Sequence, residues 1–210
     1  MGLGQKIVYS LKDRSDIDLI ATGTGLNRLV DIDNYRYLEM DITNPMQVSE
    51  VIISEEPEAV INCAAMTNVD ACEKHPKLAG EINVAGLQHI CDSFSGKIIQ
   101  LSTDYVFDGK SGPYNEKDQV CPVSIYGKTK LAAERILLDS NANNLVVRGN
   151  VLYDYSSYTK ASFLNWVVSS LKQKKEIKVV EDQYNNPTWT QSMADIIHLC
   201  ISNDLNGLVH

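Results

Sequence analysis

Short apolar runs alternate with stretches of helical character along this chain. Each run ends close to polar residues or glycine, as the buried strands of a parallel sheet do. Strands are predicted at residues 18–22, 35–40, 59–62, 97–102 and 145–148. Helices are predicted at residues 45–54, 69–74, 78–94 and 163–174, and one more helix carries Tyr126 and Lys130 and ends near residue 138. Alternation of this kind builds a parallel sheet covered by helices, so we predict a doubly wound α/β fold.

Prolines and capping residues mark several of these boundaries. Asn44 and Pro45 are typical of a cap and a first helical position, and His75-Pro76 interrupts a long helical stretch. Residues 104–122 are rich in Gly, Pro, Asp and Asn and predict a long loop. Since long loops inside compact domains are usually functional, this loop is a candidate part of a site.

Composition excludes several classes of protein. The chain has 210 residues, 44% of them hydrophobic, which is enough for one globular domain. Its net charge of -8 argues against a nucleic-acid partner, and no apolar run or signal segment indicates a membrane. The five dispersed cysteines fit reduced thiols, and the four histidines show no metal-ligand spacing. We therefore expect a cytoplasmic protein that has no metal and no membrane or nucleic-acid partner.

The most informative pair is Tyr126 and Lys130. Residues four apart share one face of a helix, so the phenol and the ammonium could point into one pocket. A neighbouring cation favours the ionised phenol and brings its pKa toward the working range of an acid or base. The pair therefore indicates carbonyl reduction, although a surface tyrosine beside a solvated lysine would show the same spacing.

Residues just after the predicted strands are candidates for binding. In doubly wound sheets, ligands bind beyond the carboxyl ends of the strands. The residues at these places are Gly23, Gly25 and Arg28; Asp41 and Ile42; Cys63, Ala64 and Ala65; Thr103 and Asp104; and Gly149 and Asn150. The small residues at 63–65 would let a flat cofactor lie against the backbone, but a tightly packed strand end needs small residues too.

Several motifs together resemble one known family. They are Asn62-Cys-Ala-Ala65, Asn83, Ser102-Thr-Asp-Tyr-Val-Phe-Asp-Gly109, Tyr114 with Glu116, Pro122 before Tyr126-Gly-Lys-Thr-Lys130, Glu134, Arg148, and Asp182-Gln183 with Pro187-Thr188. This set resembles the extended short-chain dehydrogenase/reductase superfamily and, within it, the dTDP-4-dehydrorhamnose reductase family of sugar-nucleotide reductases. The resemblance implies one Rossmann-like domain that binds NAD(P), to which residues of about 150–190 add a substrate lobe.

The resemblance also implies roles for individual residues. Tyr126 would protonate the substrate oxygen, Lys130 would hold the nicotinamide ribose and lower the Tyr126 pKa, and Thr103 would bind the carbonyl group. Asn83 stands where many members have an asparagine that supports the lysine through water, or it is simply a polar helix residue. The implied cofactor-binding residues are Gly4, Arg28, Asp41, Ile42, Cys63, Ala64, Ala65, Ser102, Tyr126 and Lys130. The implied substrate-binding residues are Thr103, Asp104, Val106, Asn150 and Val151.

Charged residues near the predicted strand ends indicate which nicotinamide cofactor the protein prefers. An acidic residue after the second strand of this fold binds the ribose hydroxyls of NAD, whereas an arginine accommodates the 2′-phosphate of NADP. Arg28 follows Gly23-Thr-Gly25, and no acidic residue lies at that strand end. We therefore expect NADPH, with NADH as the alternative and Arg28 as a solvated charge in that case. A nucleotide-sugar is the expected substrate. The sequence is compatible with a homodimer but does not determine the oligomeric state.

Two features depart from the family pattern. The superfamily opens with a strand and a Gly-x-x-Gly-x-x-Gly turn that binds the pyrophosphate at a helix start. Here Gly4 matches the last glycine, Met1 stands in the place of the middle one, and residues 206–210 resemble the start of a strand. We therefore expect either a fragment that lacks the central first strand or a member that binds cofactor poorly. Arg148-Gly-Asn-Val151 also replaces Arg-Thr-Ser-Trp, so we expect a nucleotide-linked deoxysugar in general rather than a rhamnose precursor.

Two alternatives remain beside a reductase of a 4-keto deoxysugar nucleotide. The first is a noncatalytic subunit that resembles the regulatory subunit of methionine adenosyltransferase, which the incomplete glycine turn favours. The second is an NAD-dependent sugar-nucleotide epimerase. A dehydratase is disfavoured because Tyr105 stands where that class has a glutamate.

Overall fold

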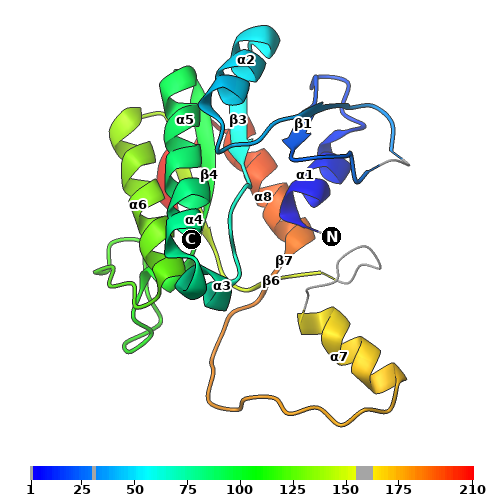
Figure 1. Cartoon of the computed structure of the whole chain (residues 1–210), viewed down its shortest axis with the longest axis vertical. Coiled ribbons are helices and arrows are strands. Elements are labelled where there is room, and N and C mark those ends of the chain that lie inside the picture. Colours follow the sequence, from blue (N-terminus) through cyan, green and yellow to red (C-terminus); the bar gives the residue numbers. More distant parts are fainter. Residues whose placement is uncertain (1, 30–31, 155–162) are drawn as a thin grey trace.

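The protein is built around parallel strands, and its computed structural model describes residues 2–29, 32–154 and 163–210 (Figure 1). The main sheet has four strands in the order β3-β4-β5-β8. Their bounds are β3 Ala59–Asn62, β4 Lys97–Thr103, β5 Leu145–Gly149 and β8 Gly207–Val209. Two smaller parallel pairs are β1 Ile20–Gly23 with β2 Arg36–Glu39, and β6 Leu152–Tyr153 with β7 Thr188–Trp189.

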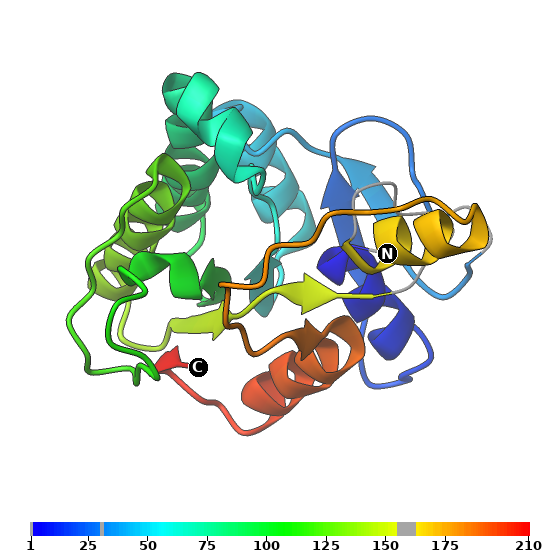
Figure 2. The same cartoon turned by 90° about the horizontal axis from the view of Figure 1, so that it is seen from below.

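Helices cover both faces of the main sheet (Figures 1 and 2). One face is covered by α1 Leu3–Leu11 and α8 Thr190–Ser202, and the other by α2 Pro45–Glu55, α5 Gly86–Ser93 and α6 Ile125–Ser140. Side chains alternate along β5, where Val146 packs toward α5 and α6 while Leu145 and Val147 pack toward α1 and α8. The predicted doubly wound α/β fold is confirmed.

The sheet is divided where the family pattern has its first strand. No ladder joins β1 to β3 within the part of the chain that the structure describes, so each of them is the edge of its own sheet. Edge strands present unpaired backbone groups along one side. The β1–β2 pair is therefore held to the rest of the molecule by its connections and by side-chain packing.

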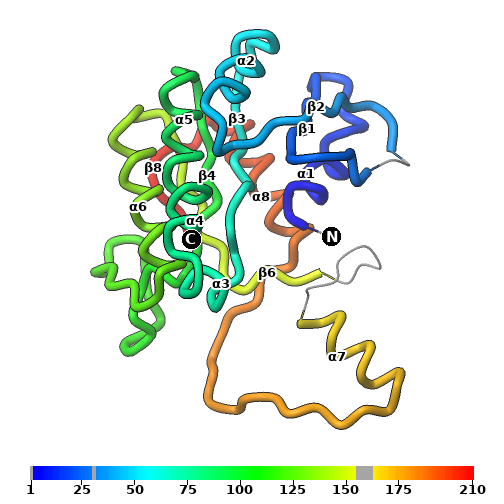
Figure 3. Tube along the Cα trace, viewed as in Figure 1, coloured from blue at the N-terminus to red at the C-terminus, as the bar shows by residue number. Residues whose placement is uncertain are grey.

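The long helical stretch after β3 is more varied than predicted. It consists of α3 Val69–Lys74, α4 Pro76–Gly80, the π-helical segment η1 Glu81–Ala85 and α5. The predicted start at residue 78 is two residues late, because Pro76 is accommodated at the first position of α4, where no backbone donor is needed. The predicted helix at 163–174 is α7 Phe163–Lys172, which stands apart from the helix layers, and Figure 3 follows the irregular segment 173–187 from α7 back to β7.

Asn144 joins three elements at the end of the sheet opposite the predicted site. It is fully buried, and its side-chain oxygen accepts a hydrogen bond from the Ile98 backbone nitrogen of β4 at 2.8 Å. Its side-chain nitrogen donates to the Leu137 carbonyl of α6 at 3.1 Å, and its own carbonyl accepts from Gly207 of β8 at 2.8 Å. Buried polar groups that are fully bonded in this way fix the relative places of the elements they join.

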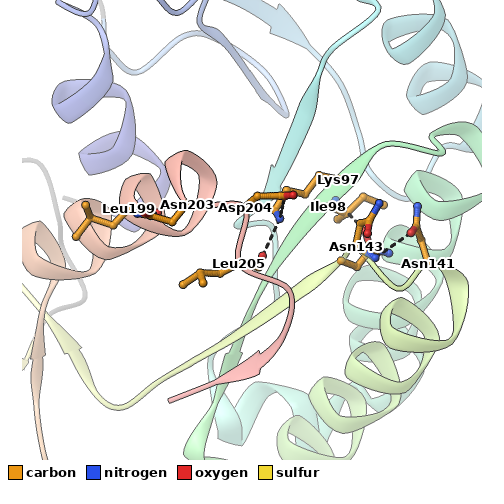
Figure 4. Close-up of polar contacts among 9 residues, drawn as sticks. Lys97, Ile98, Asn141, Asn143, Leu199, Asn203, Asp204 and Leu205 are labelled. Carbon is orange, nitrogen blue, oxygen red and sulfur yellow. Dashed lines mark hydrogen bonds and ion pairs between the residues drawn. The ribbon is translucent and has the colours of Figure 1, made fainter.

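An ion pair lies close to this junction. Lys97, the first residue of β4, donates from Nζ to Asp204 Oδ1 at 2.8 Å and to the Leu205 carbonyl at 2.7 Å (Figure 4). The lysine side chain is 11% exposed and that of Asp204 is 86% exposed, so one partner remains in water. The contact ties the turn after α8 to the start of β4.

Candidate active site

The predicted catalytic residues lie at the carboxyl edge of the main sheet. Thr103 is the last residue of β4, and α6, which begins at Ile125, carries Tyr126 and Lys130 in its first two turns. Helix α6 begins cleanly because Ser124 accepts a hydrogen bond from the Gly127 backbone nitrogen at 3.0 Å. The cap fixes the first turn of the helix, which is the turn that carries Tyr126.

Gly127 allows this turn to approach the residues that follow β4. A Cβ atom on Gly127 would lie 2.2 Å from the Tyr105 carbonyl oxygen in the short 3₁₀ turn η2 Asp104–Val106. No side chain fits at that distance, so a glycine is required here. The approach also brings the Tyr105 and Tyr126 rings into an edge-to-face contact with their centroids 5.6 Å apart.

Thr103 acts on the acidity of Tyr126. A polar interaction with the Thr103 side chain lowers the pKa of the Tyr126 phenol, and the Thr103 hydroxyl itself donates to Asp104 Oδ1 at 3.0 Å. Burial has the larger, opposite effect and raises the pKa of Tyr126 to about 12. The sequence predicted that Lys130 would lower the Tyr126 pKa; in this structure burial outweighs any such effect, and the phenol stays protonated at neutral pH.

Lys130 lies one turn further along α6 and is 3% exposed. Burial lowers the pKa of its ammonium to about 8, and the smaller opposing effects of Cys63 and Glu134 offset this only in part. Its Nζ donates to the Leu101 carbonyl of β4. The lysine is therefore held against the strand that ends in Thr103, and its charge changes within two pH units of neutrality.

The start of α1 meets the end of β3. A Cβ atom on Gly4 would lie 3.5 Å from Cys63 Cβ, so these two predicted cofactor residues are neighbours. Ala64 and Ala65 follow in the loop after β3, and the Ala64 backbone nitrogen donates to Asn62 at 3.1 Å. Burial raises the pKa of the Cys63 thiol to about 12, so the thiol is not a nucleophile at neutral pH.

Asn83 connects the loop after β3 to helix α6. Its side-chain oxygen accepts from the Met66 backbone nitrogen at 2.7 Å, and its side-chain nitrogen donates to the Met66 carbonyl and to Thr129 Oγ1 at 3.1 and 3.0 Å. Thr129 in turn donates to the Tyr126 carbonyl at 2.8 Å. Asn83 lies in the π-helical segment η1, and such segments are frequent at functional sites. The amide therefore braces the turn that carries Tyr126.

The residues predicted to contact the adenosine end follow the two strands of the smaller parallel pair. Arg28 is exposed and follows β1, and Asp41 and Ile42 follow β2. The pKa of the Asp41 carboxyl is lowered by hydrogen bonds from Thr43, which occupy one of its oxygens, and Ile42 is buried between α2 and α5. Arg28, Asp41 and Ile42 thus follow the strands of the smaller β1–β2 pair, whereas Thr103, Tyr126 and Lys130 belong to β4 and α6.

The comparisons with known proteins agree with this arrangement. The family model described as RmlD substrate binding domain matches residues 2–210. The chain belongs to this family. It is 35% identical to the dTDP-4-dehydrorhamnose reductase of Aggregatibacter actinomycetemcomitans, over 85% of this chain and 65% of that protein. It is 33% identical to the dTDP-4-keto-6-deoxy-D-glucose reductase of Streptomyces niveus, over 92% of this chain and 67% of that protein.

A solved structure is similar as well. The dTDP-4-dehydrorhamnose reductase of Bacillus anthracis, crystallised in complex with NADP, superimposes with a TM-score of 0.79 at 30% identity and covers 91% of this chain and 73% of that one. The chain spans between about half and two thirds of the length of the curated relatives that it matches.

Three predicted substrate residues of this family member lie after β5 and β4. Asn150 follows β5, and its side-chain oxygen is buried with no hydrogen-bond partner in the described structure. Val151 is 41% exposed and adopts a φ of 35°, a left-handed conformation that is rare for a branched side chain. Val106 is fully buried and packs against Phe107 and Leu131, which speaks against direct contact between Val106 and a substrate.

One buried polar cluster was not predicted. Ser102, which the sequence predicted beside the cofactor, donates its hydroxyl to Glu134, and Arg148 makes two hydrogen bonds to the same carboxylate. Glu134 lies four residues after Lys130 and therefore on the same face of α6. Its partners on β4 and β5 become visible only once the sheet is formed.

No group of three or more His, Cys, Asp or Glu side chains within residues 2–29, 32–154 and 163–210 could hold a metal ion. In the same residues, no helix combines the length and the apolar character that crossing a bilayer requires.

Proposed function

We propose that this protein reduces the keto group of a 4-keto deoxysugar nucleotide with NADPH. The observation that carries the proposal is the placement of Thr103 at the end of β4 and of Tyr126 and Lys130 in the first two turns of α6. The similar proteins in this family are named as reductases of such sugars. NADPH would supply the hydride. A cytoplasmic location is part of the proposal, because all five cysteines are free.

The chain's own residues supply the proton and the orientation. Thr103 and Tyr126 would both hydrogen-bond the substrate carbonyl oxygen, and Tyr126 would donate its phenolic proton to that oxygen as the alkoxide develops. The raised pKa of Tyr126 keeps this proton in place at neutral pH. Lys130, charged below about pH 8, would favour the phenolate that forms.

The residues at the sheet edge fit a nicotinamide cofactor. Gly4 and Cys63 are in contact across the start of α1, Ala64 and Ala65 have small side chains beside it, and the Asn150 side-chain oxygen is buried without a partner. A bound polar group would satisfy that oxygen, as buried polar atoms require. Asp104 and Val151 would contact the sugar. All of these residues come from one polypeptide. In a homodimer, each subunit would therefore carry a complete site of its own.

The direct test is turnover. The chain should consume NADPH when a dTDP-4-keto-6-deoxysugar is added, and Tyr126→Phe should lower kcat by about a thousandfold or more, because it removes the proton donor and leaves the ring in place. NADPH oxidation followed at 340 nm and the alcohol product identified by mass spectrometry are the measurements. Isomerisation of the sugar without net NADPH use would support an epimerase. Cofactor binding without any turnover would support a noncatalytic subunit.

Arg28 is the expected determinant of the NADPH preference. Burial raises the pKa of Tyr37, the charge of Glu39 adds to this effect and that of Arg28 opposes it, so both charges lie close to this tyrosine beside β1. Arg28→Ala should weaken NADPH binding about tenfold and leave NADH binding within about twofold, since only NADPH carries a 2′-phosphate. Titrations that follow nicotinamide fluorescence measure both constants. The exposed Arg135→Ala is the control, and an equal loss for both cofactors would remove this role.

A further inference from the structure

A buried charged cluster lies directly behind the proposed catalytic residues. It consists of Ser102, Glu134 and Arg148, which are 8%, 2% and 7% exposed. Ser102 precedes Thr103 on β4, Arg148 is its cross-strand partner on β5, and Glu134 follows Lys130 by one turn of α6. The cluster therefore contacts each of the three elements that meet at the site.

Three hydrogen bonds to the Glu134 carboxylate hold the cluster together. Arg148 donates from Nε to Glu134 Oε1 at 2.9 Å and from Nη2 to Oε2 at 2.7 Å, a two-point contact that fixes both side chains. The Ser102 hydroxyl donates to Oε1 of the same carboxylate. Arg148 also lies with its Nη1 3.1 Å from His210 Nε2 and its guanidinium 5.1 Å from the centre of the Phe107 ring. One carboxylate thus joins α6 to two neighbouring strands.

Stability alone is a weak explanation for such a group. Taking two charges out of water costs about as much as their attraction returns, and apolar residues of similar volume often serve a fold equally well. The position of the cluster offers a better explanation. Two turns of α6 separate Glu134 from Tyr126. Because the Glu134 carboxylate is bonded to both strands, it fixes the position of the helix along the strand direction.

We propose that Ser102, Glu134 and Arg148 are positioning residues that hold Tyr126 and Lys130 of α6 in register with Thr103 of β4. This inference rests on the proposed reductase function. The carboxylate of Glu134 acts through the backbone of α6 and touches neither substrate nor cofactor. Its charge also supports the ammonium form of Lys130, whose pKa it raises against the larger effect of burial.

Two variants separate position from folding. Ser102→Ala removes only the link to β4 and leaves the ion pair, so it should fold normally and lower kcat by about 10-fold, while the KM for the sugar nucleotide changes by less than about threefold. Glu134→Gln combined with Arg148→Met removes both charges and avoids an unpaired buried arginine. This double variant should keep a cooperative thermal transition and lower kcat by about 100-fold.

The matched control is the ion pair at the other end of the same strand. Asp204→Asn breaks the contact between Lys97 and Asp204 shown in Figure 4 and keeps a residue that tolerates its positive φ of 49°. It should leave kcat and KM unchanged. Equal kcat losses in Asp204→Asn and in the double variant would overturn the inference, because they would show a general response of β4. Full kcat in both Ser102→Ala and the double variant would overturn it as well.

A readout without turnover keeps this inference distinct from the proposed function. Crystal structures of the double variant and of the starting chain should differ in the separation of the Thr103 and Tyr126 hydroxyl groups by about 1 Å, the scale at which misplacement affects rate. If the starting chain reduces no 4-keto sugar nucleotide while this shift is present, the function fails and the positioning role stands. If the hydroxyl groups keep their separation, the positioning role fails whatever the activity.

Discussion

At the scale of single residues, burial sets the acid and base properties of the site. Tyr126 and Lys130 share one helix face, and burial moves both away from their charged forms: the Tyr126 pKa rises to about 12 and the Lys130 pKa falls to about 8. A reductase needs a protonated phenol, so the raised pKa suits the proposed direction of reaction. Lys130 is then the group that titrates nearest to neutral pH.

The pH dependence of kcat/KM should therefore report Lys130. Below pH 8 its ammonium is charged, and above pH 8 the charge is lost while Tyr126 stays protonated. We expect kcat/KM to be level from about pH 6 to 8 and to fall about tenfold per unit above that, since kcat/KM follows the ionisation of the free enzyme. Initial rates in overlapping buffers measure the profile. An alkaline fall that begins only near pH 10 would show that Lys130 has its ordinary pKa.

Lys130→Met provides the matching stability measurement. A cation whose pKa is lowered by folding costs stability below its folded pKa, and this cost is relieved as pH rises from about 8 toward 10.5. At pH 7 the variant should be inactive yet at least as stable to heat as the starting chain, because it removes a buried charge. A large drop in its melting temperature would show instead that the bond from Lys130 to the Leu101 carbonyl outweighs the cost of burial.

At the scale of elements, the site depends on how closely α6 approaches η2. Gly127→Ala places a Cβ atom within 2.2 Å of the Tyr105 carbonyl oxygen, so the helix or the turn must move by about 1 Å. We expect kcat to fall by about 100-fold, with a loss of stability of about 1 to 3 kcal/mol. Gly80→Ala in α4 is the control, because its Cβ would meet nothing within 4 Å and its φ is -65°. Normal activity in Gly127→Ala would show that the close approach is not needed.

The same scale shows which elements the sequence could predict. Helix α2 was recognisable because Asn44 caps it and Pro45 opens it, and the Asn44 side chain does accept hydrogen bonds from the backbone nitrogens of Met46 and Gln47. Helix α8 was missed although Met193, Ile197 and Cys200 mark one buried face. Helix α1 was missed because Gly4 was interpreted only as part of a glycine turn. The strands β6 and β7 have two residues each, too few for any pattern.

For the candidate site, too, the sequence indicated individual residues but not the contacts between distant elements. Spacing along one helix indicated Tyr126 and Lys130, and the ends of parallel strands indicated Thr103. The partners of Glu134 were out of reach, because Ser102 lies 32 residues away and Arg148 14 residues away in sequence. Local patterns show which face a residue occupies, whereas pairing between elements follows from the order and register of the strands.

At the scale of the whole molecule, the divided sheet predicts uneven stability. Strands β4 and β5 are almost entirely buried, whereas β1 and β2 contain only intermediate and exposed residues and form a separate pair. Elements with little buried surface open locally, without unfolding of the rest. Amides of β1 and β2 should therefore exchange with deuterium much faster than those of β4 and β5. Equal protection in both sheets would mean that they unfold as one unit.

Bound NADPH should reduce the difference in amide exchange between the two sheets if the cofactor contacts both of them. Arg28 follows β1 and Asp41 follows β2, while Tyr126 and Lys130 stand at the edge of the main sheet, so a cofactor held by both groups would favour the state in which the two parts are together. A ligand that binds only this state stabilises it by mass action. Hydrogen exchange with and without saturating NADPH should show protection gained in β1 and β2, with β4 as the internal reference. Arg28→Ala at the same NADPH concentration should gain less, and protection confined to the main sheet would place the cofactor away from Arg28 and Asp41.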